Sequence, residues 1–261
     1  MILKGKVVII VGVGPGMGKA MAVIAAKEGA KVALGARNPT YLNTVVAEII
    51  DDGGEALALS TDVTDPAQCR ALVAKTVERW GRVDGLVNSA YAPGENGGFD
   101  DANIESWKHT IDVACLGAAR MAQAVLPHMV AQGGGAIVNV ATMQAQKPLP
   151  GGSLSYAIAK GALVTTSRQL AAEMAKYNIR VNATRMGWLW GEPVRNALIG
   201  MAESQGTTVE ALQEGIAKSI PLGVIPPEGD CAKSVLMLIS DYTKMVTGAV
   251  LDVNGGDWMA P

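Results

Sequence analysis

The chain has 261 residues, of which 49% are hydrophobic, and a formal net charge of −2 at pH 7. This length fits one large α/β domain or two small ones. The balanced charge, without a long run of one sign, excludes the electrostatic footprint of a protein that binds nucleic acid or an anionic membrane.

The cysteines and the N-terminal segment bear on location. Cys69, Cys115 and Cys231 have neither C-x-x-C nor metal-ligand spacing, which indicates reduced thiols in the cytoplasm and no metal site. The apolar run 7–11 ends at Gly12 and is too short for a signal peptide. No uninterrupted apolar stretch is long enough to cross a membrane.

Apolar runs alternate with amphipathic segments along the whole chain. Because the run 7–11 is continuously apolar and glycines follow it, we expect a strand buried on both faces, as in a parallel sheet. The alternation predicts βαβ units and a Rossmann-like, doubly wound parallel sheet in a single α/β domain, 1–261. The predicted strands are 7–11, 31–36, 56–60, 83–87, 136–140, 179–183 and 249–253, and the predicted helices are about 17–28, 41–52, 66–80, 101–130, 153–177, 193–219 and 229–240.

A glycine-rich turn follows the first predicted strand. Gly12, Gly14, Gly16 and Gly18 alternate with other residues, among them Met17, and a helix begins within the turn. Glycines let the backbone approach a ligand closely, and the helix end offers free N–H groups and a positive dipole to a pyrophosphate. The spacing differs from the common G-x-G-x-x-G fingerprint, but the position predicts dinucleotide binding; the alternative is a merely flexible turn.

The end of the second strand bears on the choice of cofactor. An acid there would bind the ribose hydroxyls of NAD, whereas a guanidinium suits the 2′-phosphate of NADP. The segment ends at Ala36-Arg37 and contains no acid. We therefore expect Arg37 to bind NADP, or NADPH, rather than NAD, although an ordinary surface charge is the alternative.

The next two strand ends are also expected to contact the cofactor. Asp62, followed by Val63, can accept a hydrogen bond from the adenine amino group or cap the next helix, for which Asp65 is better placed. Asn88 and Ala90 follow the fourth strand, where small residues let a cofactor ring or ribose lie against the backbone.

Tyr156 and Lys160 lie four residues apart in a predicted helix and therefore on one face. A nearby ammonium favours the phenolate, so the pKa of Tyr156 should fall from its free value of about 10. At about 4 Å and an effective dielectric of about 20, the attraction is at most about 4 kcal/mol, or roughly three pKa units. The pair is a candidate general acid–base, although chance also produces such pairs.

A series of motifs in this order resembles the short-chain dehydrogenase/reductase family from one end of the chain to the other. The motifs are Gly12-x-x-x-Gly16-Met-Gly18, Asp62-Val63, Asn88-Ser-Ala90, Ile137-Val-Asn-Val-Ala-Thr142, Tyr156-x-x-x-Lys160, Arg180-Val-Asn182-Ala, Met186-Gly187 and the segment from Gly248 to Gly256.

The resemblance implies an oxidoreductase. Tyr156 would donate a proton to a carbonyl as hydride arrives from the nicotinamide. Lys160 would hold the nicotinamide ribose and lower the Tyr156 pKa. Thr142, at the family's serine position, would hydrogen-bond the substrate oxygen. Gly187 and Leu189, after the sixth strand, are expected to contact the cofactor together with Tyr156 and Lys160.

The resemblance also places a lid over the substrate at about 188–226, with a helix starting at Pro193. We expect the lid and nearby residues to form an apolar pocket for a hydrophobic or aromatic ketone or alcohol; simple packing of the lid is the alternative. The expected lining residues are Tyr91, Met143, Leu149, Leu154, Trp188 and Trp190.

Several positions depart from the family pattern. Ala114 stands where the family has an Asn that relays protons to the lysine, and Gly191 stands where a Thr often contacts the pyrophosphate. Two functions are therefore open: an NADP-dependent oxidoreductase that interconverts a carbonyl and a secondary alcohol, and a dinucleotide-binding regulator without turnover. The resemblance further implies a homo-oligomer, either a homotetramer or a dimer.

Overall fold

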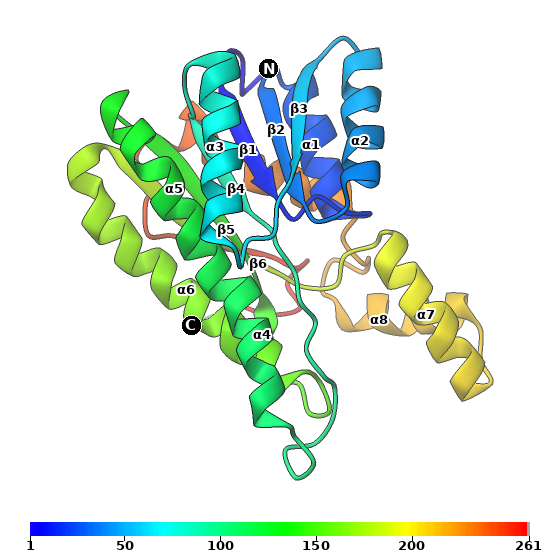
Figure 1. Cartoon of the computed structure of the whole chain (residues 1–261). Helices are drawn as coiled ribbons and strands as arrows, with labels where there is room; N and C mark the ends of the chain where they lie inside the picture. The colour runs from blue at the N-terminus through cyan, green and yellow to red at the C-terminus, as the bar shows by residue number, and fades with distance from the viewer. Residues whose placement is uncertain (260–261) are drawn as a thin grey trace.

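The computed structural model describes residues 1–259. Seven strands form one parallel sheet in the order β3-β2-β1-β4-β5-β6-β7, with helices on both faces (Figure 1). The predicted Rossmann-like doubly wound fold is therefore confirmed. The strands are β1 (Val7–Val11), β2 (Lys31–Ala36), β3 (Glu55–Ser60), β4 (Gly85–Asn88), β5 (Gly135–Thr142), β6 (Ile179–Met186) and β7 (Val250–Val253).

The two largest hydrophobic cores among residues 1–259 lie on opposite faces of the sheet. All five residues of β1 are buried, and their side chains alternate between the cores, Val8 and Ile10 facing one and Ile9 and Val11 the other. This confirms a central strand covered on both faces. The first core packs α1 (Met17–Lys27), α2 (Pro39–Asp51) and α9 (Glu228–Ile239), and the second packs α3 (Pro66–Trp80), α5 (Gly117–Ala131) and α6 (Leu154–Met174).

The predicted helix over 101–130 is divided. It comprises a short 3₁₀ turn η1 (Ile104–Ser106), α4 (Trp107–Ile111), a π-helical turn η2 (Asp112–Leu116) and α5. Asp112 spans the π turn, because its carbonyl accepts the Gly117 N–H and its carboxylate binds Arg120 at 2.7 Å. A Cβ on Gly117 would lie 2.6 Å from the Val63 side chain, so the helix packs closely against the β3–α3 loop here.

Within the described chain, one helical stretch, Ile104–Ala131, meets the length and hydropathy of a membrane span. Half of its most apolar 18-residue window is buried inside the domain. Its helices contact α3 and α6, so the stretch serves as a core element of the fold.

The predicted lid helix over 193–219 is two helices, α7 (Glu192–Gln205) and α8 (Val209–Ser219). Gly206, with a φ of 63°, ends α7, and the Thr208 side chain caps α8 by accepting from Ala211 N at 3.1 Å. Pro193 lies in the first turn of α7, as expected. Both helices project beyond the carboxyl ends of the strands (Figure 1).

Two neighbouring strands are longer than predicted. β5 and β6 continue past the expected ends at 140 and 183, because they pair with each other as far as Thr142 and Met186. Thr142 is thereby held at the carboxyl end of the sheet. Three further 3₁₀ turns complete the fold, η3 (Met143–Ala145), η4 (Ala175–Tyr177) and η5 (Asp241–Thr243).

Candidate active site

The β1–α1 turn forms an open cradle at the start of α1. A Cβ on Gly12 would collide with the backbone of Ser89 and Ala90, so the turn lies directly against the end of β4. Gly16, with a φ of 99°, is the N-cap of α1, and no side chain among residues 1–259 caps this helix. A Cβ on Gly14 would meet nothing within 4 Å, so a ligand can reach the backbone. These features fit an anion at the helix N-terminus.

The other two residues of the glycine-rich turn serve packing. A Cβ on Gly18 would lie 2.5 Å from the Gly12 carbonyl oxygen, so only glycine allows this approach of helix and turn. The Met17 side chain lies in the hydrophobic core. Of Met17, only the backbone is therefore available to a cofactor.

Arg37 is exposed directly after β2. Its backbone carbonyl accepts the Ser60 hydroxyl at 3.2 Å, which ties the residue to the end of β3. The following residue, Asn38, caps α2 by accepting from Tyr41 N at 3.1 Å. Within the described part of the chain, no ion pair involves the Arg37 guanidinium, so it is free to bind a phosphate.

Asp65 rather than Asp62 caps α3, as expected. Asp65 accepts from Ala67 N at 2.7 Å. Asp62 accepts from Thr64 N at 2.9 Å and from the Thr64 hydroxyl at 2.8 Å, both through Oδ1. These bonds, led by the Thr64 N–H, hold the pKa of Asp62 below its usual range. The Asp62 carboxylate is therefore ionised, and its Oδ2 takes part in neither of the two bonds with Thr64.

Asn88 belongs to a buried chain of hydrogen bonds that joins the sheet to α6. Its Nδ2 donates to Asn139 Oδ1 at 2.8 Å, and Asn139 Nδ2 donates to Ser167 Oγ at the same distance. The expected cofactor contact therefore has to come from the backbone after β4, or from Asn88 Oδ1, which is buried without a partner among the described residues. No sequence motif pointed to Ser167.

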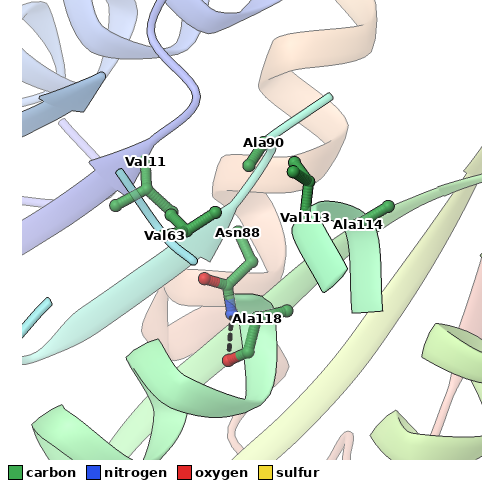
Figure 2. A pocket seen from close by; sticks show the side chains of 7 residues that line it. All are labelled: Val11, Val63, Asn88, Ala90, Val113, Ala114 and Ala118. Atoms are coloured by element: carbon green, nitrogen blue, oxygen red, sulfur yellow. Dashed lines mark hydrogen bonds between the residues drawn. The ribbon is translucent and has the colours of Figure 1, made fainter. Parts of the chain in front are cut away.

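A small hollow lies beside the π turn, between Val11 at the end of β1 and Ala114 (Figure 2). It is too tight for a water molecule, and Ala114 presents only a methyl group to it. Ala114 therefore supplies no polar group to this hollow, as its place in the sequence led us to expect. The residues around the hollow are Val11, Val63, Asn88, Ala90, Val113, Ala114 and Ala118.

The expected acid–base pair lies on α6. Ser153 caps this helix by accepting from Tyr156 N at 3.3 Å, as predicted. Lys160 is buried, and its Nζ donates to the Val140 carbonyl at 2.7 Å and lies 5.8 Å from the centre of the Tyr156 ring. The ring of Tyr91 meets that of Tyr156 edge-on at 5.3 Å, with an interplanar angle of 82°.

The electrostatics of this pair differ from the expectation. Burial raises the pKa of Tyr156, with a smaller contribution from Tyr91. Burial also lowers the pKa of Lys160 to about 8, against a smaller opposing effect of Cys115. The predicted lowering of the Tyr156 pKa by Lys160 is wrong for this arrangement, because the ammonium bonds to the Val140 carbonyl and does not offset the desolvation of the phenol.

Thr142 is buried at the end of β5. Its hydroxyl donates to the Met186 carbonyl at 3.3 Å and accepts from Gln144 N at 3.4 Å, so it caps η3. The hydroxyl must turn away from Met186 to donate to a substrate. Val140, the acceptor of Lys160, precedes Thr142 by two residues on the same strand, so β5 links both groups.

The structure separates the residues expected to bind substrate. Tyr91 contacts Tyr156, and Met143 lies next to Gly187, whereas Leu149 and Leu154 are exposed. An open cleft of about 610 Å³ along the start of α7 includes Trp190 but not the other five. Trp188 is partly buried, and Leu189 packs against the core that contains α1 and α9. The cleft is lined by Trp190, Gly191, Glu192, Arg195, Asn196 and Ile199.

Glu228, in the first turn of α9, is a site residue that the sequence did not reveal. A Cβ on Gly191 would collide with its carboxylate, and a Cβ on Gly16 would lie 3.2 Å from it. Burial raises the pKa of Glu228, and Glu192 adds to this, while Lys19 opposes it. Gly191 is therefore the residue type that this carboxylate allows. No local pattern connects α9 with the cradle, so the sequence carried no signal.

Comparison with known proteins agrees with this geometry. Residues 12–257 match the family model described as Enoyl-(Acyl carrier protein) reductase. The chain is 33% identical over 259 residues to 3-oxoacyl-(acyl-carrier-protein) reductase of Thermotoga maritima, covering 97% of this chain and 98% of that protein. It is 31% identical over 255 residues to levodione reductase of Leifsonia aquatica, covering 96% of this chain and 93% of that protein.

A solved structure shows the same fold. L-sorbose reductase from Gluconobacter frateurii, complexed with NADPH and L-sorbose, has a TM-score of 0.92 and 30% sequence identity, covering 98% of both chains. The fold, the glycine cradle and the Tyr156–Lys160 pair agree with these similarities, and the chain belongs to the short-chain dehydrogenase/reductase family of oxidoreductases.

Proposed function

We propose that the protein is an NADP-dependent oxidoreductase that interconverts a carbonyl and a secondary alcohol. The observation that carries this proposal is the placement of Tyr156 and Lys160 on one face of α6, with Lys160 bonded to the end of β5. Ligands of doubly wound folds bind beyond these strand ends.

The residues of the β1–α1 turn fit a dinucleotide. Gly14 leaves the turn before the uncapped start of α1 open, so the N–H groups and dipole of the helix can hold the pyrophosphate. The exposed Arg37 can hold a 2′-phosphate, and the similar L-sorbose reductase was solved with NADPH. When bound, the reduced nicotinamide supplies a hydride.

Tyr156 is the proposed proton donor. As the carbonyl carbon accepts hydride, the Tyr156 hydroxyl gives its proton to the carbonyl oxygen, which becomes the alcohol. A raised pKa keeps this phenol protonated at neutral pH, and therefore favours reduction. Oxidation needs the phenolate, and should gain as the pH rises. Lys160, which is largely cationic below a pKa of about 8, can stabilise that phenolate.

The aromatic side chains near Tyr156 and at the cleft support a carbonyl substrate with an apolar part, while the cleft also carries the charged residues Glu192 and Arg195. Tyr91 lies edge-on to Tyr156, and Trp190 borders the cleft at α7. Thr142 can stabilise the developing charge on the substrate oxygen once its hydroxyl turns from Met186. We also propose a cytoplasmic location, which the three free, buried cysteines support.

A regulator without turnover is the second candidate. The hollow at Ala114 favours the regulator. Ala114 supplies no polar group there and the hollow has no room for water, whereas a proton route to Lys160 would need a polar group or a water molecule. Binding of NADPH and NADH, followed by a screen of ketones and alcohols with the preferred cofactor, distinguishes the two candidates. Tight NADPH binding with no turnover across the screen would favour the regulator.

Replacing Tyr156 with Phe should lower kcat by about 10²–10⁴-fold, the usual contribution of a general acid. NADPH affinity should remain within about twofold, because the ring is retained. Tyr177→Phe, on the 3₁₀ turn after α6, is the matched control and should leave kcat unchanged. Steady-state kinetics and fluorescence titration provide both values. Retained activity in Tyr156→Phe would contradict the assignment.

Replacing Arg37 with Asp should weaken NADPH binding by about 10–100-fold, the equivalent of losing a hydrogen bond to a charged group. It should improve NADH binding, because the new carboxylate can accept from the ribose hydroxyls. Arg70→Asp, at an exposed position of α3, makes the same change in net charge elsewhere. An equal loss in both variants would show that only net charge matters.

Replacing Glu228 with Gln should tighten NADP⁺ binding by about 3- to 10-fold, because a carboxylate beside the cradle repels the pyrophosphate. In the unaltered protein, affinity should rise as the pH falls through the raised Glu228 pKa, since protonation removes that charge. The variant should lose this dependence. Asp230→Asn, in the same turn of α9, is the control. Calorimetry at several pH values measures how NADP⁺ affinity depends on pH in the unaltered protein and in Glu228→Gln. The same pH dependence in both proteins would contradict the prediction.

The protein should be a dimer or tetramer in solution. Leu116, at the end of η2, and Ile158, on α6, are each 46% exposed, and Leu154 lies near Ile158 in sequence with 37% exposure. These apolar side chains can be covered by a second copy. Light scattering should give a multiple of the 27.0 kDa chain. Leu116→Lys combined with Ile158→Lys should reduce it to a monomer. A monomeric unaltered protein would refute the prediction.

A further inference from the structure

The loop after β5 is tied to the C-terminal segment by an ion pair. Lys147 Nζ donates to Asp257 Oδ1 at 2.5 Å and to the Asp257 backbone carbonyl at 3.1 Å. The Asp257 carboxylate is only 6% exposed, and the Lys147 side chain is 32% exposed. A carboxylate buried to this extent depends on its partner, because an unpaired buried charge is strongly unfavourable. The contact is therefore more than a solvated surface pair.

A second tie reaches the same loop from β6. Arg185 binds Asp252 of β7 in a bidentate pair, Nε and Nη2 each lying 2.8 Å from a carboxylate oxygen. Its Nη1 donates to Gln146 Oε1. Gln146 and Lys147 are adjacent, so the C-terminal strand and the segment after it both hold one short piece of chain.

This piece of chain closes the turn that begins at Thr142. The backbone N–H groups of Gln146 and Lys147 both donate to the Met143 carbonyl, at 2.9 and 2.8 Å. Within the turn, Gln144 N donates to the Thr142 hydroxyl. A displacement of 146–147 therefore moves the donor that orients the hydroxyl.

The C-terminal segment is itself anchored. A Cβ on Gly187 would lie 2.8 Å from the Asn254 Cβ, so the chain after β7 packs directly against the end of β6. Asn254 Nδ2 donates to the Trp258 carbonyl at 2.8 Å, and its Oδ1 accepts from Gly256 N at 3.0 Å. Asp257 is thus held by its neighbours on both sides, and can act as a fixed point for Lys147.

We propose that Lys147 and Asp257 are positioning residues, through which the C-terminal segment sets the place of the Thr142 hydroxyl. The kinetic consequence rests on the proposed function, since it assumes that Thr142 contacts the substrate oxygen. The structural consequence, that the ion pair holds the turn at 146–147 in place, does not depend on the proposed function. A group displaced by about 1 Å can lose up to about 100-fold in rate, so the ion pair governs kcat more than cofactor binding.

Replacing Lys147 with Met keeps most of the side-chain length and removes the ammonium. Hydrogen exchange at the Gln146 and Lys147 amides should become at least about tenfold faster, because the turn is no longer held. With a substrate from the screen, kcat should fall about tenfold, and NADPH affinity should stay within about twofold. Lys147→Arg should restore most of the kcat, since a guanidinium can bind the same carboxylate.

Lys6→Met is the matched control. It removes an ion pair of 2.8 Å that also joins distant parts of the chain, Lys6 with Asp241. Lys6 directly precedes β1, so this pair lies at the amino end of the strand, away from Thr142. It should leave both the exchange of 146–147 and kcat unchanged. Equal losses in the two variants, or unchanged exchange in Lys147→Met, would overturn the proposal.

Two further outcomes are separable. If the unaltered protein turns over nothing, the proposed function fails, and the exchange measurement alone decides whether Asp257 holds the loop. Thermal unfolding and NADPH titration show whether Lys147→Met folds. If it does not fold, Asp257→Asn replaces it in the experiment. That variant keeps the backbone carbonyl as an acceptor for Lys147, and should give a smaller change in the same direction.

Discussion

The hydrogen bond from the Lys160 ammonium to the Val140 carbonyl joins the two halves of the proposed site. A buried ammonium needs a partner, because its transfer from water is costly without one. The partner here is the backbone of β5, next to the strand end that carries Thr142. The bond therefore fixes α6, and with it Tyr156, relative to the edge of the sheet where the cofactor is proposed to bind. Its distance of 2.7 Å is that of a strong, charge-assisted bond.

Other buried polar groups also hold α6 and the loop after β5 in place against the sheet. Asn139 bonds both Asn88 of β4 and Ser167 of α6, so a buried amide holds the helix against two strands. The loop after β5 is also held from the C-terminal segment, directly by Asp257 and through Arg185 of β6 by Asp252. Since buried polar groups are costly when unpaired, these contacts specify one arrangement of the elements.

The positive dipole end of α1 and the negative charge of Glu228 have opposite effects on an anion in the cradle. The start of α1 favours an anion, yet Glu228 presents a carboxylate beside Gly16. Its raised pKa reflects this position, since burial and Glu192 both disfavour the ionised form. Under the proposed function, cofactor affinity is then a balance between attraction by the helix dipole and Arg37 and repulsion by Glu228. Gly191 follows from the same carboxylate and is not simply the loss of a contact.

The sequence by itself determined the parallel sheet, the cradle between β1 and α1, and the shared face of Tyr156 and Lys160, because periodicity and glycine placement are local. The caps Ser153 and Asp65 were predictable for the same reason. Only the tertiary structure decided the pKa directions, the position of Glu228 and the Lys147–Asp257 pair. Burial and contacts between distant segments set these properties, and no local pattern records which side chains the fold will bring together.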